Sequence, residues 1–227
     1  KMTACFLRRS TTPISPCVRR RCSRRHARCG CAPWERAEIP GVTNGIRIGV
    51  FGGSFDPPHR AHVELVRHVL GSGEIDRVWV VPVFAHAFGK QLAPFEDRME
   101  MCRLAFADVA NVEVSSIEST LPVPNYTLTT LGALVAAHPN ASWRLLVGGD
   151  VLARLDEWHR IEEVKALAPL LVMGRVGHEG EGAPAAVLPD ISSTEVRALV
   201  AEAREATLSQ FVPVPVAEYI SKHGLYR

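Results

Sequence analysis

The chain has 227 residues, of which 47% are hydrophobic and 22% charged, a composition typical of a globular protein rather than of a disordered chain. No apolar run approaches the roughly 20 residues that a transmembrane helix needs, so a membrane-spanning protein is not expected. The net charge of +2 is unevenly distributed, because residues 1–45 carry ten Lys and Arg against two Glu, whereas residues 46–227 carry 16 basic and 22 acidic side chains. We therefore expect a disordered leader rich in Arg and Cys over 1–45, and a mildly acidic folded domain over 46–227.

The leader has three competing interpretations. Its Arg clusters and its Ser and Thr content are typical of a transit-like peptide. Its cysteines could form a metal or nucleic-acid module, and the whole segment could be an unstructured extension. Four of these cysteines are Cys17, Cys22, Cys29 and Cys31. Their spacing matches no paired Cys-x2-Cys zinc pattern, which favours the unstructured extension.

A single cysteine, Cys102, lies in residues 46–227. This argues against a disulfide framework and indicates a reducing compartment. The expected location of the protein is therefore the cytoplasm.

Apolar strands alternate with helical segments from Ile46 onward. Strands are expected at residues 47–51, 77–83, 111–117, 143–147 and 170–173, with a candidate sixth at 186–188. Helices are expected at 61–70, 95–109, 126–137, 151–167 with a break near Asp156, 193–206 and 214–223. Continuous apolar strands separated by helices of about ten or more residues indicate a parallel sheet covered on both faces. The predicted fold class is α/β, a doubly wound parallel sheet in a single domain, and such sheets bind ligands where the strand order reverses.

Residues 52–62 follow the first predicted strand and read Gly-Gly-Ser-Phe-Asp-Pro-Pro-His-Arg-Ala-His. Gly52 and Gly53 allow a tight turn and a close approach of a ligand to the backbone. His59 and His62 lie three residues apart around the expected helix start, where backbone N–H groups and the helix dipole favour phosphate. The segment is neither a Gly-x-Gly-x-x-Gly fingerprint nor a P-loop. Alternative interpretations are a structural turn with two surface histidines, or a metal pair without an evident third ligand.

Residues 191–197 form a second candidate phosphate motif, Ile-Ser-Ser-Thr-Glu-Val-Arg, at the start of the penultimate predicted helix. Ser192 or Ser193 is expected to cap this helix. Taken alone, the segment is adequately explained as a capped helix on which Arg197 is a surface charge.

Both segments resemble motifs of one enzyme family. Residues 52–62 resemble the (His/Thr)-x-Gly-His motif of the adenylyltransferase superfamily, and more closely the Gly-Gly-Ser/Thr-Phe-Asp-Pro-x-His-x-Gly-His form of bacterial nicotinate-nucleotide adenylyltransferases. Ala61 replaces the usual Gly before the second His, and both residues are small. Residues 191–197 resemble, at every fixed position, the motif Ile-Ser-Ser-Thr-x-x-Arg, which holds the ATP β- and γ-phosphates in that family. The resemblance covers residues 46–227 and implies a Rossmann-like nucleotidyltransferase fold.

Further segments resemble positions that the family uses for its substrates. Residues 125–131 resemble the family's Ser-Tyr-Thr-x-Asp-Thr-Leu, with Thr129 in place of the acidic residue. Trp158 resembles a Trp that stacks near the nicotinate base, and a core position is its alternative interpretation. Lys90 resembles, in altered form, the lysine of a Pro-His-Lys loop, and an exposed surface lysine is the alternative there. Three more matches lie at strand ends: Gly148, Asp150 and Arg175.

The resemblance implies transfer of the AMP moiety of ATP to nicotinate mononucleotide, which yields deamido-NAD and pyrophosphate in NAD biosynthesis. It also implies that Mg²⁺ binds through the ATP phosphates rather than at a dedicated protein metal site. The implied catalytic residues are His59, His62 and Arg197. The implied ATP-binding residues are Gly52, Gly53, Ser54, Phe55, His59, His62, Gly148, Asp150, Arg175, Ile191, Ser192, Ser193, Thr194 and Arg197. The implied acceptor-binding residues are Ser54, Phe55, Lys90, Tyr126, Thr127 and Trp158.

Three alternatives stay open. A related adenylyltransferase could use nicotinamide mononucleotide or phosphopantetheine as its acceptor. A non-catalytic nucleotide-binding protein on the same fold would bind ATP without releasing pyrophosphate. A leader-driven nucleic-acid binder would rely on the Arg clusters of residues 8–28. The preferred prediction has ATP and nicotinate mononucleotide as partners, no nucleic acid or membrane, and a homo-oligomer as the candidate assembly.

Overall fold

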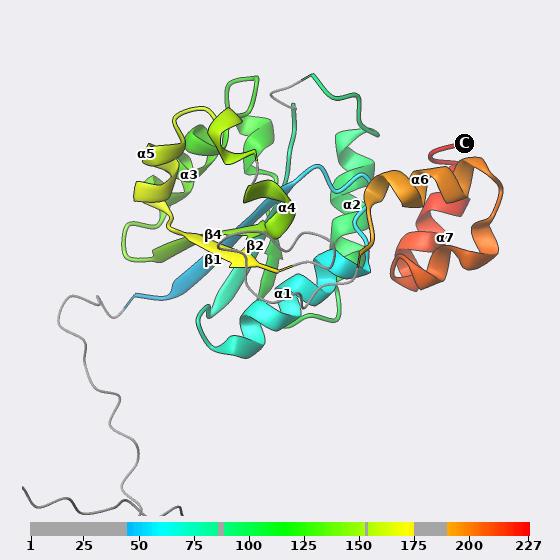
Figure 1. Cartoon of the computed structure of the whole chain (residues 1–227), viewed down its shortest axis with the longest axis horizontal. Coiled ribbons are helices and arrows are strands. Elements are labelled where there is room, and N and C mark those ends of the chain that lie inside the picture. Colours follow the sequence, from blue (N-terminus) through cyan, green and yellow to red (C-terminus); the bar gives the residue numbers. More distant parts are fainter. Residues whose placement is uncertain (1–44, 86–88, 153, 175–189) are drawn as a thin grey trace, which may run out of the picture. The chain divides into compact units, whose positions relative to one another are not determined.

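The computed structural model describes residues 45–85, 89–152, 154–174 and 190–227 (Figure 1). Three predictions from the sequence lie outside these residues: the leader over 1–45, apart from its last residue, the candidate strand at 186–188, and Arg175. Within the described ranges, no helix combines the length and the apolar character that crossing a bilayer would require.

A five-stranded sheet forms the centre of the described structure, and every neighbouring pair of strands is parallel. The strands are β1 (Arg47–Gly53), β2 (Arg77–Pro82), β3 (Val112–Val114), β4 (Ser142–Gly148) and β5 (Leu170–Met173). Their spatial order is β3-β2-β1-β4-β5. The chain therefore builds outward from β1 through β2 to β3, and then crosses back to place β4 and β5 on the other side. The predicted α/β fold class is confirmed, and the strand order reverses between β1 and β4.

Helices cover both faces of this sheet. The α-helices are α1 (Arg60–Ser72), α2 (Phe95–Phe106), α3 (Thr127–Ala137), α4 (Gly149–Leu152), α5 (Ile161–Leu167), α6 (Ser193–Ala201) and α7 (Val214–His223). The described residues also form the 3-10 helices η1 (Ile117–Thr120), η2 (Leu155–Glu157) and η3 (Glu205–Gln210). Figure 1 shows α3 and α5 on one side of the strands and α1 on the other.

Two hydrophobic clusters lie on opposite faces of the sheet. Neighbouring residues of β1 belong to different clusters, with Phe51 in the first core cluster and Val50 in the second. Leu146 and Leu145 of β4 are divided in the same way. This alternation follows from the two-residue period of a strand. The first cluster contains side chains of α1, α2, α6 and α7, and the second contains side chains of α3 and α5, so both faces of the sheet are buried, as the continuous apolar strands predicted.

Three predicted elements differ most from the structure in their extent. The strand predicted over 111–117 is shortened to β3, because the chain turns into η1. The helix predicted over 193–206 is shortened to α6, because Ala203 has a φ of 55°, a left-handed conformation that does not continue an α-helix. The helix predicted over 151–167 is divided into α4, η2 and α5, so its predicted break is confirmed, and left-handed Arg160 precedes α5.

Arg98, in the first turn of α2, is only 1% exposed. Its Nε donates a hydrogen bond to the Ala93 carbonyl and its Nη1 donates one to the Ser54 carbonyl, both at 2.9 Å. Burial lowers the pKa of this guanidinium, and the negative charge of Asp56 acts in the opposite direction. Because an arginine in a protein keeps its proton, a buried cation ties the loop after β1 to α2.

Replacing Arg98 by Met should lower the free energy of unfolding by about 3–5 kcal/mol, because the change removes a buried cation that faces Asp56 and leaves two carbonyls without donors. Arg103→Met is the matched control, since Arg103 lies on the same helix but forms an exposed pair with Glu100 at 3.2 Å. That variant should lose no more than about 1 kcal/mol. Urea unfolding measures both variants, and equal losses would contradict the role assigned to Arg98.

Candidate active site

A cavity of about 640 Å³ opens at the carboxyl ends of β1 and β4, between which the strand order reverses. Its volume falls within the range of roughly 300–1,000 Å³ that is usual for small-molecule sites. The end of β1 contributes Gly52 and Gly53 to its lining, Ser54 follows them, and the end of β4 contributes Val147 and Gly148. The cavity therefore lies where a doubly wound sheet is expected to bind its ligand.

One wall of the cavity is aromatic. Tyr126 is the N-cap of α3, and its ring lies 4.7 Å from the ring of His159, centroid to centroid. Trp158 lines the same cavity and also packs against the second core cluster. Trp158 therefore packs partly in the core, and its contact with a substrate stays a prediction. Such a wall offers flat apolar faces to a planar ring.

A buried carboxylic acid, Glu118, also lines the cavity and is 7% exposed. Its Oε1 accepts a hydrogen bond from Thr130 Oγ1 at 2.9 Å, and its Oε2 accepts one from the Phe84 N–H at 3.0 Å. Asn125 joins the same segments, because its Nδ2 donates to the Glu118 carbonyl and its Oδ1 accepts from the Ala85 N–H. Burial raises the pKa of Glu118, and the two hydrogen-bond donors oppose that shift. The network holds the loop after β2 against the segment that precedes α3.

The two histidines of the first motif meet at the start of α1. His59 is the N-cap, and its backbone N–H donates a hydrogen bond to His62 Nδ1 at 3.1 Å. The two rings are stacked, with centroids 3.6 Å apart. Because His62 Nδ1 accepts this hydrogen bond, the ring carries its proton on Nε2, which is then a donor nitrogen. His59 is 5% exposed, so it is a buried residue. The alternative interpretation of this segment, a structural turn with two surface histidines, therefore does not describe His59.

Two phenylalanine rings pack against His62. The centroid of the Phe55 ring lies 5.0 Å from that of His62, and the centroid of the Phe51 ring lies 5.7 Å from it. Phe55 is 1% exposed and has a φ of 46°, a left-handed conformation that is uncommon outside glycine. Its side chain belongs to the core, so any contact of Phe55 with a substrate is limited to its backbone.

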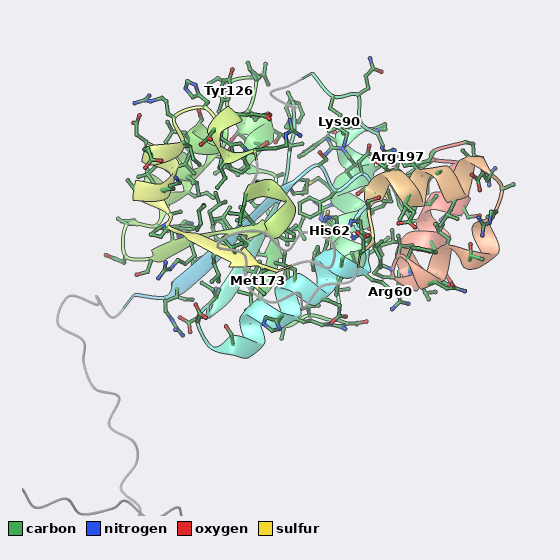
Figure 2. All side chains as sticks on the ribbon, in the orientation of Figure 1. Arg60, His62, Lys90, Tyr126, Met173 and Arg197 are labelled. Atoms are coloured by element: carbon green, nitrogen blue, oxygen red, sulfur yellow. The ribbon has the colours of Figure 1, made fainter. Side chains whose placement is uncertain are left out.

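The second phosphate motif docks directly on the first. Ser193 Oγ donates a hydrogen bond to the Pro57 carbonyl at 2.9 Å, and Arg197 Nη1 donates one to the Asp56 carbonyl at 2.7 Å. These partners are 136 and 141 positions apart in the sequence. In Figure 2, His62 on α1 and Arg197 on α6 are found close to the junction of these elements. The N-termini of both helices, which favour anions, therefore adjoin the same loop.

Hydrogen bonds within the second motif fix its helix start. Ser192 Oγ accepts a hydrogen bond from the Glu195 N–H at 3.2 Å, which confirms Ser192 as the cap. Arg197 Nη2 donates to Thr194 Oγ1 at 3.2 Å. Arg197 is thus a tethered and partly buried cation rather than a lone surface charge.

Asp56 belongs to the first motif, faces Arg197 of the second and is 2% exposed. Its Oδ1 accepts hydrogen bonds from the Tyr226 hydroxyl at 2.9 Å and from the Ala93 N–H at 3.1 Å. Its Oδ2 lies 3.7 Å from Arg197 Nη1. One side chain therefore connects the loop after β1 with α6, with the segment before α2 and with the residues after α7.

Most of the residues expected in the site fall into two groups. Seven of them line the large cavity: Gly52, Gly53, Ser54, Tyr126, Thr127, Gly148 and Trp158. Six belong to the two helix starts: His59, His62, Ser192, Ser193, Thr194 and Arg197. Ile191 is buried in the first core cluster. The side chain of Asp150 and the whole of Arg175 lie outside the described residues.

Lys90 is not brought to the large cavity. It is exposed and lines a second cavity of about 490 Å³, together with Phe84, Phe95 and Arg98. The reason is its place in the chain, since residues 89–95 lead into α2 and form the lining of that second cavity. The contact expected between Lys90 and the acceptor stays a prediction.

Three buried residues that hold the site together were missed in the sequence: Asp56, Glu118 and Asn125. A weak signal existed, because Asp56 and Asn125 lie inside segments that resemble family motifs, and Glu118 is an acidic residue at the end of a predicted strand. Their roles depend on partners that the fold brings to them, so sequence spacing alone could not assign them.

Comparison with known proteins places these features in a family. Residues 50–199 match the sequence model of a family described as cytidylyltransferase-like. A nicotinate-nucleotide adenylyltransferase of Anaeromyxobacter dehalogenans (strain 2CP-1) is 44% identical over 190 residues, which cover 82% of this chain and 100% of that relative. A protein of the same name from Myxococcus xanthus is 34% identical and covers 80% of this chain and 95% of its own length.

Solved structures share the fold at lower sequence identity. The Plasmodium falciparum nicotinic acid mononucleotide adenylyltransferase complexed with NaAD has a TM-score of 0.67 at 20% identity, over 80% of this chain and 97% of that chain. The same enzyme complexed with APC has a TM-score of 0.65 at 19% identity, over 80% and 97% of the two chains. At these identities the likeness concerns the fold alone. The family model matches most of the chain, and the two relatives named above are 44% and 34% identical to it over nearly their whole length. The chain therefore belongs to the nicotinate-nucleotide adenylyltransferase family of cytidylyltransferase-like enzymes.

Proposed function

We propose that this chain transfers the AMP moiety of ATP to nicotinate mononucleotide, which forms deamido-NAD and releases pyrophosphate in NAD biosynthesis. The observation that carries the proposal is the docking of α6 on the loop after β1, through Ser193 and Arg197, beside a cavity with an aromatic wall. The names of the relatives, and the NaAD bound to the Plasmodium falciparum enzyme, support the same reaction.

The proposed reaction is a displacement at the α-phosphorus of ATP. An oxygen of the mononucleotide phosphate attacks that phosphorus and forms a new P–O bond, while the bond to the oxygen of the β-phosphate breaks. Pyrophosphate leaves with the electron pair. Because the attacking phosphate is already an anion, the step needs neither a general base nor a covalent enzyme intermediate. The protein contributes by positioning the two substrates and by stabilising the charge that develops.

His62 is proposed to stabilise the α-phosphate in the transition state. Its Nδ1 accepts a hydrogen bond from the backbone N–H of His59, so Nε2 is the ring nitrogen that carries the proton and can donate. The packed rings of Phe55 and His59 restrict the rotation of the imidazole. A donor that is oriented before the reaction costs no reorganisation when charge develops.

Arg197 is proposed to hold the outgoing pyrophosphate with the start of α6. Its Nη1 is tethered to the Asp56 carbonyl, yet a guanidinium has five N–H donors and can bind phosphate oxygens at the same time. The backbone N–H groups of Ser193 and Thr194 lie in the first turn of α6, where they favour an anion.

The cavity is proposed to hold nicotinate mononucleotide with its base against Trp158 and Tyr126. Flat aromatic faces suit a pyridine ring better than a flexible pantetheine arm. Thr127 lines the cavity at the first turn of α3, where helix N–H groups favour an anionic carboxylate over a neutral amide. These two features favour nicotinate mononucleotide over the alternative acceptors.

Mg²⁺ is proposed to bind through the ATP phosphates and water. When bound, the ion would neutralise part of the phosphate charge. Asp56, the buried carboxylate beside the phosphate loop, already accepts hydrogen bonds from Tyr226 and Ala93 and faces Arg197. Its donor environment fits a structural anion better than a metal ligand, which agrees with an ion held by the nucleotide.

We also propose a cytoplasmic location for the reaction. Cys102 is the single cysteine of residues 46–227 and is buried as a free thiol. A folded domain that does not rely on disulfides suits a reducing compartment. A homo-oligomeric assembly remains a prediction from the sequence.

Substituting His62 by Ala should lower kcat by about 10²-fold or more, because the change removes one oriented donor to the transition state. Steady-state pyrophosphate release at saturating ATP and nicotinate mononucleotide measures this effect. His68→Ala is the matched control, since His68 lies on the same helix and is exposed, and it should turn over like the wild type. Near-normal turnover of His62→Ala would remove His62 from the mechanism.

Substituting Trp158 by Ala should raise the KM for the acceptor by about tenfold or more, because a stacking face for the base is lost. The KM for ATP should stay unchanged in this variant. Trp158→Phe retains an aromatic face and should recover most of the affinity. If the Ala variant raised both KM values equally, Trp158 would instead act through the general integrity of the fold.

Pyrophosphate release with each of three acceptors tests the proposed substrate. With Mg²⁺ and ATP, nicotinate mononucleotide should give the highest kcat/KM, ahead of nicotinamide mononucleotide and phosphopantetheine. Preference for either rival acceptor would overturn the proposed substrate. ATP binding without pyrophosphate release from any acceptor would instead favour the non-catalytic nucleotide-binding alternative.

A further inference from the structure

The residues after α7 return to the phosphate loop. Gly224 ends α7 in a left-handed conformation with a φ of 62°, and its N–H bonds to the Ile220 and Ser221 carbonyls. The Leu225 N–H also donates to the Ile220 carbonyl, at 3.1 Å. This turn reverses the chain and carries Tyr226 back toward the first core cluster, against which it packs.

Tyr226 adopts an unfavourable backbone conformation at this point. Its φ is 66°, a left-handed conformation that residues other than glycine rarely adopt. Such a conformation persists only where surrounding contacts hold it. One contact that holds Tyr226 in place is the hydrogen bond from its hydroxyl to Asp56 Oδ1 at 2.9 Å, which joins residues 170 positions apart.

The hydroxyl of Tyr226 remains a donor under ordinary conditions. Burial raises the pKa of the phenol, and the adjacent negative charge of Asp56 raises it further, while Arg197 and Arg98 oppose the shift. The phenol therefore keeps its proton at the pH at which the enzyme would normally be assayed.

The Asp56 carboxylate has two possible sources of hydrogen-bond donors, which are Tyr226 with Ala93 on one side and Arg197 on the other. In the structure its Oδ1 is held by Tyr226 and Ala93, and Arg197 Nη1 donates to the Asp56 carbonyl oxygen at 2.7 Å rather than to the carboxylate. The distance from Nη1 to Oδ2 is 3.7 Å, longer than a hydrogen bond. If the phenol were removed, a carboxylate that is 2% exposed would lack one donor, and the nearby guanidinium of Arg197 could supply it by a small shift.

We propose that Tyr226 is a positioning residue, which holds the Asp56 carboxylate so that Arg197 remains available to the phosphates of ATP and to the outgoing pyrophosphate. The inference rests on the proposed function, in which Arg197 binds those phosphates. It assigns a role in nucleotide binding to a residue that follows the final helix and lies outside both phosphate motifs.

The test is the Tyr226→Phe variant, which removes the hydroxyl and keeps the ring. The KM for ATP should rise about tenfold, the scale expected for a hydrogen bond to a charged group, while the KM for nicotinate mononucleotide stays within about twofold of the wild type. Equilibrium binding of pyrophosphate should weaken by a similar factor. This second measurement does not depend on turnover.

Tyr219→Phe is the matched control. The Tyr219 hydroxyl donates to Asp97 Oδ1 at 2.8 Å, so this variant also loses a hydrogen bond from a tyrosine hydroxyl to a carboxylate, but that carboxylate belongs to α2 rather than to the loop after β1. Thermal unfolding of both variants reports the general loss of stability. Tyr219→Phe should leave the KM for ATP unchanged.

Two results would overturn the inference. The first is a Tyr226→Phe enzyme with unchanged KM for ATP and unchanged pyrophosphate affinity. The second is a loss shared equally by both substrates and by the Tyr219→Phe control, which would show only a structural role. Failure of the proposed function is recognised separately, because the wild type would then release no pyrophosphate with any acceptor.

Discussion

The carbonyls of the loop after β1 accept hydrogen bonds from side chains of distant helices, and the arrangement of those helices around the loop depends on these bonds. Residues 54–58 end in two consecutive prolines, which have no N–H, yet most of the segment is buried and its carbonyls still require partners. Side chains from elsewhere supply them. Arg98 of α2 donates to the carbonyl of residue 54, and Arg197 and Ser193 of α6 donate to those of residues 56 and 57. The loop that is proposed to bind triphosphate is thus also the surface on which these helices are assembled.

The hydrogen-bond donors of the second motif therefore have two uses, which are bonding the loop after β1 and binding phosphate. A guanidinium can serve both purposes because it has several N–H donors, whereas a serine hydroxyl has a single proton. The Ser193 proton is already engaged by the Pro57 carbonyl, so Ser193 would contact phosphate through its backbone N–H. Arg197 retains further donors after binding the Asp56 carbonyl. The motif therefore combines a mainly structural hydroxyl with a cation that has both roles.

Features that depend on local pattern were predictable from the sequence, and those that depend on distant partners were not. The bounds of β5 and α7 agree with the prediction residue for residue, because each is an uninterrupted apolar or amphipathic run flanked by breaking residues. The burial of Asp56 and its bond to Tyr226 had no local signature, since 170 positions separate the two residues. Motif resemblance also left open whether a residue acts through its side chain or its backbone. Phe55 matches the family motif, yet its ring is enclosed in the core.

The division of the core by the sheet has a consequence for how such a protein could diversify. The loop, α1 and α6 belong with the first core cluster, whereas α3 and Trp158 pack with the second. Substitutions on the α3 and α5 side would reshape the cavity and leave the contacts between the two phosphate motifs intact. A duplicated gene could therefore drift toward a new acceptor through changes on one face of the sheet, and inherit the adenylyl-transfer apparatus unchanged from the other.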